Sequence, residues 1–161
     1  MGQCSLMRAW RISKAKRAKD LSGQGAAFEG GRWNEVEIRA LYLGLSPGIC
    51  CLETFVHQNL RPIIPMKITV LELPDDPALY LEPALGDLPN GWNALPADRP
   101  SMDFGTDWLN RGEQLGLILP SAVMPLERNI MLNPLHPAMK EVQIVDVLDF
   151  SYDDRMFLVR D

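Results

Sequence analysis

Short apolar runs, each ended by proline, glycine or aspartate, are the feature that most constrains the fold of this chain. Runs of this length that are rich in leucine, isoleucine and valine are typical of β-strands, whereas helices need longer segments with apolar residues three or four positions apart. The sequence predicts five strands, at residues 40–46, 67–73, 115–120, 128–134 and 142–150.

Two helices are expected beside these strands. Ser46 can cap a helix and Pro47 suits a first helical position, so a helix is predicted from Pro47 to about Asn59. A second, short helix is expected within residues 102–114, and residues 74–103, rich in proline, aspartate and glycine, are interpreted as a long functional loop or excursion. The predicted class is α+β, with a mixed, largely antiparallel sheet core and flanking helices.

The positive charge of the chain is concentrated in one stretch. RISKAKRAK, residues 11–19, is interpreted as a solvated, helix-prone face. The formal net charge of the whole chain is -5, which argues against a general nucleic-acid surface. No direct contact with nucleic acid is therefore expected.

Length and composition indicate one domain, spanning residues 1–161, since 47% of the residues are hydrophobic and can build a core. No signal peptide and no bilayer-length apolar run is visible, so no membrane contact is expected. The cysteines are Cys4, Cys50 and Cys51; two adjacent cysteines are poorly placed for a disulfide framework. A cytoplasmic location is predicted.

Familiar metal and nucleotide motifs are missing from the sequence. His57 and His136 are its only histidines, and neither CxxC nor HExxH spacing occurs, so no metal is expected. Neither a P-loop nor a Rossmann GxGxxG pattern is present. Any nucleotide must be bound in another way.

Three residues of the N-terminal half are candidates for a binding or catalytic site. In GGRWN, residues 30–34, glycines let the backbone approach a ligand and Arg32 offers a fork of donors for phosphate or carboxylate. In ALYLGLS the leucines share one strand face, while Tyr42 lies on the other, where a flat ring can stack on it; a half-buried strand tyrosine is the alternative. Glu53 lies at the edge of an apolar helix stripe and needs either a function or a route to water.

The C-terminal half adds polar residues at strand ends. Ser121 follows a strand that ends in proline, and it has no GxSxG context, so a hydrogen-bonding role is favoured over that of a nucleophile; a turn serine is the alternative. Asn129 and Asn133 interrupt an otherwise apolar strand, and Asn133 is also a candidate turn residue before Pro134.

The blocks AWRIS, GGRWN, ALYLGLS, CLETFVH, LPSAVMP and RNIMLNPLHP, in this order from about Trp10 to Pro137, resemble the RES domain family. The arginine, glutamate and serine that give the family its name correspond to Arg32, Glu53 and Ser121, and Tyr42 matches a tyrosine that commonly accompanies them.

The resemblance implies a bacterial type II toxin with a fold similar to the ADP-ribosyltransferase toxins and with NAD as its substrate. Arg32 is then expected to bind the diphosphate, Tyr42 to stack on nicotinamide and Glu53 to act in catalysis, while Ser121 and Asn133 are expected to bind substrate. The implied partner is an Xre-type helix-turn-helix antitoxin that blocks the active site, and a homodimer within the complex is a further expectation.

The resemblance leaves the acceptor open. Water, inorganic phosphate as a co-substrate, or a protein side chain can each take the ADP-ribose. Transferases that modify arginine typically carry two glutamates separated by one residue, and here Cys51 occupies the first of these positions before Glu53. A non-catalytic interaction module, with Arg32 and Glu53 as a structural ion pair, is the remaining alternative.

Overall fold

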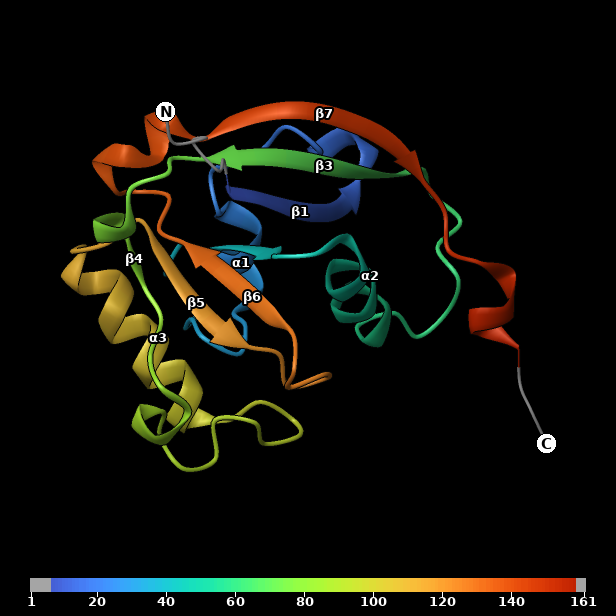
Figure 1. The fold of residues 1–161 in the computed structure, drawn as a ribbon. Helices are drawn as coiled ribbons and strands as arrows, with labels where there is room; N and C mark the ends of the chain where they lie inside the picture. The colour runs from blue at the N-terminus through green and yellow to red at the C-terminus, as the bar shows by residue number, and fades with distance from the viewer. Residues whose placement is uncertain (1–6, 159–161) are drawn as a thin grey trace.

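One seven-stranded sheet organises the computed structural model, which describes residues 7–158 (Figure 1). All neighbouring strands are antiparallel except β4 and β5, and β5 and β6 run obliquely to β1, β3 and β7. The predicted α+β class is confirmed, and the five predicted strands correspond to β2, β3, β5, β6 and β7. In sheet order the strands are β4 (Tyr80–Leu81), β5 (Gly116–Pro120), β6 (Arg128–Leu132), β2 (Leu41–Gly44), β1 (Met7–Lys14), β3 (Met66–Leu73) and β7 (Gln143–Phe150).

The prediction of a helix-prone basic face at residues 11–19 was wrong. Arg11 to Lys14 belong to β1, which lies between β2 and β3, and only the 3-10 turn Ala15–Arg17 follows it. Long, straight cationic side chains favour helix locally, but pairing with β3 along the whole of β1 satisfies the backbone and buries Ala9 and Ile12. Long-range pairing therefore overrides the local preference.

Within residues 7–158, three α-helices flank the sheet: α1 (Gln24–Glu29), α2 (Pro47–Val56) and α3 (Arg99–Arg111). The predicted cap is confirmed, because the Ser46 hydroxyl accepts a hydrogen bond of 3.1 Å from the Ile49 amide; α2 ends three residues earlier than expected. Asp98 caps α3 ahead of the predicted start, and Gly112 ends it with φ of 63°. No helix within residues 7–158 is long and apolar enough to cross a membrane.

Residues 74–103 are more ordered than the predicted loop. They contain β4, the 3-10 turns Pro77–Leu79 and Leu85–Asp87, and the first turn of α3. Tyr80 pairs with Gly116 at the edge of the sheet, and its hydroxyl donates to the Pro74 carbonyl at 2.5 Å. Strand pairing by the Tyr80 backbone and the hydrogen bond from its side chain thus order part of a segment that was expected to be irregular.

Both faces of the central strands are buried. One hydrophobic cluster contains Leu41 and Leu43, as the predicted alternation required, and it extends over β1, β3 and β6. A second cluster lies where α3 covers β5 and β6, and Tyr42 packs against it. The second face is the one that carries the candidate site. Its fully packed members are Trp33, Ala40, Leu88, Trp108, Leu109, Leu117, Leu119 and Met131.

Candidate active site

Glu53 is brought to the sheet by the close docking of α2. A Cβ atom added to Gly44 of β2 would lie 2.7 Å from the backbone nitrogen of Cys50, closer than side chains normally approach. Only glycine therefore allows α2 to lie so near to β2. This contact sets the distance between Glu53 and the neighbouring strand β6.

The Glu53 carboxylate is held by two donors from the sheet. Its Oε1 accepts a hydrogen bond of 2.6 Å from the Ser121 hydroxyl and one of 2.7 Å from the Asn129 side-chain amide. Ser121 follows β5, Asn129 belongs to β6, and the two strands are antiparallel neighbours. Among residues 7–158, Glu53 Oε2 has no hydrogen-bond partner.

Ser121 is a fully buried turn residue as well as a partner of Glu53. Its hydroxyl oxygen accepts hydrogen bonds from the Val123 and Met124 amides at 3.1 and 3.0 Å. The two amides hold the hydroxyl in one place, so its proton is directed at Glu53.

Arg32 lies half-buried, with one edge of its guanidinium in use. Nη1 donates to the carbonyl oxygens of Trp92 and Ala94, both at 2.9 Å. Its remaining donors, on Nε and Nη2, have no hydrogen-bond partner in the described part of the chain. Burial lowers the pKa of Arg32, while the charge of Glu53 and, to a smaller extent, Tyr42 act in the opposite direction.

Tyr42 anchors the GGRWN loop, residues 30–34, to the sheet. Its hydroxyl donates to Asn34 Oδ1 at 2.6 Å and accepts a hydrogen bond from the Trp33 amide at 3.1 Å. Burial raises the pKa of Tyr42 far above its ordinary value. The Asn34 amide donates in turn to the carbonyls of Ala26 and Ile38, both at 2.9 Å, and Asn34 is fully buried. Because the hydroxyl is committed, the ring is the part of Tyr42 that remains for a ligand.

Helix α3 supports the same loop from the other side. A Cβ added to Gly105 would lie only 2.0 Å from the Trp33 carbonyl oxygen, so the helix and the loop are in direct backbone contact. The Trp33 ring stacks on Trp92, with centroids 6.1 Å apart, and meets Phe104 edge-on at 6.0 Å. These contacts hold the backbone on either side of Arg32.

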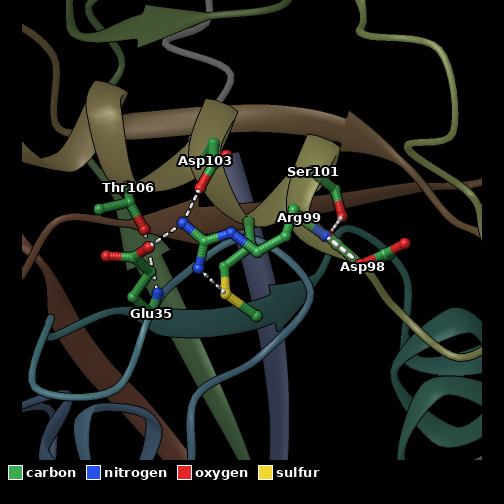
Figure 2. A network of polar contacts seen from close by, with 7 residues as sticks. Glu35, Asp98, Arg99, Ser101, Asp103 and Thr106 are labelled. Atoms are coloured by element: carbon green, nitrogen blue, oxygen red, sulfur yellow. Dashed lines mark hydrogen bonds and ion pairs between the residues drawn. The ribbon is translucent and has the colours of Figure 1, made fainter.

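A polar network at the surface joins the residue after the loop to α3 (Figure 2). The Glu35 amide donates to Thr106 Oγ1 at 3.0 Å, and Arg99 Nη2 lies 2.6 Å from carboxylate oxygens of both Glu35 and Asp103. Since the Arg99 side chain is 62% exposed, these ion pairs contribute little to stability. The half-buried hydrogen bond from the Glu35 amide to Thr106 is the stronger link between the loop and α3.

Asn133 lies apart from the group formed by Glu53, Ser121 and Asn129. It is 4% exposed at the end of β6 opposite to Asn129; its side-chain amide donates to the Leu109 carbonyl at 3.1 Å, and its oxygen accepts from the Leu135 amide at 3.1 Å. The expectation that Asn133 binds substrate is therefore not supported, because its polar atoms already join the sheet to α3 and to the following turn. Its turn role is the one observed.

The structure thus brings Glu53, Ser121 and Asn129 into direct contact and places Arg32 and Tyr42 nearby. Sequence reasoning noticed Asn129 as a polar residue in an apolar strand but gave it no role. The backbone carbonyls that hold Arg32 carry no sequence signal at all. Among residues 7–158, no group of three or more histidine, cysteine, aspartate or glutamate side chains is placed to hold a metal ion.

The sequence pattern that defines the RES domain family matches residues 8–153. The chain belongs to the RES domain family.

Two similar proteins extend this assignment to nearly full length. The RES domain protein described here is 40% identical to a protein of Sphingobium sp. (strain YBL2) named Prs ADP-ribosylating toxin, over 91% of this chain and 94% of the other. It is 36% identical to a Toxin Res of Yersinia enterocolitica, over 86% and 91% of the two chains. The relatives therefore span the same domain and little more.

A solved structure has the same fold. The RES domain superposes on a chain of the M. tuberculosis MbcT-MbcA toxin-antitoxin complex with a TM-score of 0.71, covering 91% of this chain and 85% of that one. The sequences are 19% identical, so this similarity concerns the fold alone.

Proposed function

We propose that this RES domain protein is the toxin of a toxin-antitoxin pair and that it cleaves the bond between nicotinamide and ribose in NAD. The observation that carries the proposal is an oriented carboxylate, Glu53, whose charge acts on a half-buried guanidinium, Arg32, without an ion pair between them; the Nε and Nη2 atoms of Arg32 are unengaged among the described residues. The toxin names of its relatives support the same reading.

Arg32 would bind the diphosphate. Both Nη1 protons are used by loop carbonyls, which leaves the edge formed by Nε and Nη2 for two anionic oxygens. The carbonyls also fix the plane of the guanidinium, so that little side-chain entropy is lost when the anion binds. The Tyr42 ring would stack on nicotinamide.

Glu53 would act on the ribose. As nicotinamide departs, positive charge develops on the sugar ring, and an oriented carboxylate stabilises that charge or holds a ribose hydroxyl. This chemistry requires no metal. The acceptor is water or inorganic phosphate in the proposed reaction, which takes place in the cytoplasm.

A protein acceptor is the second candidate, because the relative that is 40% identical is named an ADP-ribosylating toxin. The first steps are the same, and only the group that attacks the ribose differs. A purely structural Arg32–Glu53 ion pair is disfavoured, since no such pair occurs among residues 7–158 and each group has other partners.

The proposed partner is an Xre-type helix-turn-helix antitoxin that covers the active site; that the structure with the same fold was solved in a toxin-antitoxin complex supports an antitoxin partner. Exposed leucines of the 74–103 segment, Leu85 and Leu95, offer apolar surface to the antitoxin or to a second copy of the toxin.

The test is to incubate purified protein with NAD, with and without phosphate, and to measure nicotinamide release and the mass of the ADP-ribose product. Glu53→Gln should lower kcat by about 10²–10³-fold, as expected for loss of a charge-stabilising group. The exposed Glu113→Gln should behave as wild type. A product heavier by phosphate identifies phosphorolysis.

Arg32→Ala should raise the KM for NAD by about 10–100-fold, because a charged hydrogen-bonding group is lost. The exposed Arg39→Ala is the control. If folded wild-type protein releases no nicotinamide in either buffer, the NAD-degrading proposal fails. Labelled NAD incubated with cell extract then reveals whether a protein becomes modified; if it does not, catalysis on NAD is excluded.

A further inference from the structure

We propose that Asn129 and Ser121 form a positioning pair, which holds Glu53 through Oε1 so that Oε2 alone faces the substrate. This inference rests on the proposed function, because it assigns Glu53 the catalytic role. Ser121 then positions Glu53 and does not make the substrate contact that was expected from the sequence. Asn129, for which the sequence predicted no role, positions Glu53 as well.

The hydrogen-bonding capacity of Ser121 is fully used within the protein. A serine hydroxyl has one proton and two lone pairs. The proton goes to Glu53 at 2.6 Å, and the lone pairs face the Val123 and Met124 amides at 3.1 and 3.0 Å. Ser121 is also 0% exposed. It therefore has neither a free donor nor free surface for a ribose hydroxyl or a phosphate.

Asn129 provides the second donor from a rigid position. It lies in β6, opposite Gly44 on one side and Leu119 on the other, so strands pair with its backbone at both edges. Its side chain lies on the face shared by Tyr42 and Met131, as strand alternation requires. The amide nitrogen meets Glu53 Oε1 at 2.7 Å. A central strand with both neighbours in place holds this donor more precisely than a loop can.

Both donors bind the same carboxylate oxygen, Oε1, so they act together on the orientation of the carboxylate. Rotating the carboxylate to exchange its oxygens would break both hydrogen bonds at once, at 2.6 and 2.7 Å. The pair therefore selects one orientation before substrate binds. Such preorganisation acts on the rate of the chemical step, because the cost of orienting the carboxylate does not recur in the transition state.

The registry of the sheet explains why this pair can form. Gly44 opposes Asn129, and the absence of a side chain at Gly44 lets α2 approach the strand at that very point. A helix held farther away would place Glu53 beyond hydrogen-bonding distance of Asn129. The glycine, the asparagine and the glutamate therefore form one arrangement.

The decisive variant is Asn129→Ala, because within residues 7–158 the side-chain amide nitrogen of Asn129 donates a hydrogen bond to Glu53 alone. Ser121→Ala is the second variant, and the exposed Asn110→Ala is the matched control. For each we would measure kcat and KM for nicotinamide release, the Kd of NAD by calorimetry, and the melting temperature. The melting temperature separates loss of fold from loss of positioning.

Asn129→Ala and Ser121→Ala should each lower kcat by about tenfold or more, as loss of one hydrogen bond to a charged group would, while KM and Kd stay within about twofold of wild type. The double variant should lose less than the product of the two single effects, because both act through one carboxylate. A rise in Kd with kcat preserved would overturn the inference and restore a substrate-binding role. Wild-type kinetics in both single variants would overturn it too.

A crystal structure of Asn129→Ala tests the positioning without relying on NAD. A displaced or rotated Glu53 carboxylate supports the inference, and a carboxylate in its original place overturns it. If wild-type protein releases no nicotinamide, the proposed function fails, yet this structure still decides whether Asn129 positions Glu53. Should Asn129→Ala not fold, the same comparison is made with Ser121→Ala.

Discussion

Replacing Gly44 by alanine should damage both the stability of the protein and its active site. The added Cβ would lie 2.7 Å from the Cys50 nitrogen and 2.9 Å from its Cα and Cβ. Ordinary contact begins at 3.4 Å, so α2 must move by about 0.7 Å, and the opposing atoms belong mostly to the backbone, which cannot rotate away. Overpacking of this kind costs about 1–3 kcal/mol, more than the roughly 0.5–1 kcal/mol that alanine gains over glycine within a strand.

With the gain of alanine over glycine subtracted, the net cost is about 0–2.5 kcal/mol, which for a domain of this size corresponds to a fall in Tm of up to about 10 °C. The same shift would lengthen the hydrogen bonds from Ser121 and Asn129 to Glu53, now 2.6 and 2.7 Å, to about 3.3 and 3.4 Å. A misplacement of about 1 Å can reduce a rate by about 10²-fold, so kcat should fall by about 10–100-fold.

Melting by circular dichroism and kinetics of nicotinamide release measure the two effects. Gly48→Ala is the control in the same helix, because its added Cβ would meet only Ser46 Oγ, at 3.9 Å. It should leave kcat unchanged and stabilise the protein slightly. If Gly44→Ala keeps both the Tm and the kcat of wild type, the argument that close docking of α2 positions Glu53 is refuted.

Three further outcomes are expected. Gly105→Ala, whose Cβ would lie 2.0 Å from the Trp33 carbonyl oxygen, should displace the GGRWN loop and raise the Kd of NAD in calorimetry, whereas Gly86→Ala, with open space around it, should not. Tyr42→Phe should lower the free energy of unfolding, measured with urea, by about 1–3 kcal/mol, because the buried Trp33 amide and Asn34 Oδ1 each lose a hydrogen bond. An unchanged urea midpoint would contradict the anchoring role of Tyr42. Burial raises the pKa of Cys50 from 9.0 to about 11, so the unfolded chain ionises first and stability should fall as pH rises from about 9 to 11. That fall should be smaller in Cys50→Ala when urea unfolding is compared at pH 8 and pH 10.

The sequence predicted the strands and the capped helix well, because their signals are local. Pro47 after Ser46 and the alternation of Leu41 and Leu43 with Tyr42 depend only on near neighbours. The strand β1 was missed because its basic composition favours helix, and its pairing partner β3 begins at Met66. Local propensity cannot report a partner so far along the chain.

In the candidate site, too, some residues could be found from local sequence signals, whereas others depend on pairing between distant strands. Residue types suited to anion binding and charge stabilisation marked Arg32 and Glu53, strand alternation marked Tyr42 and a strand-end position marked Ser121; the family pattern then matched all four. The role of Asn129 depends on its register opposite Gly44, which appears only once β2 and β6 are paired. The hydrogen bond from the buried Asn133 side chain to the Leu109 carbonyl of α3 likewise carries no signal in the sequence.

The hydrogen bonds that orient Glu53 join residues 68 and 76 positions apart. During translation the ribosome therefore delivers Glu53 long before it delivers Ser121 and Asn129. A nascent chain can form α2 early, but it cannot complete a catalytic arrangement of the proposed kind until β6 has emerged and inserted between β2 and β5. The proposed active site is therefore completed late in synthesis, when the strand that carries Asn129 joins the sheet.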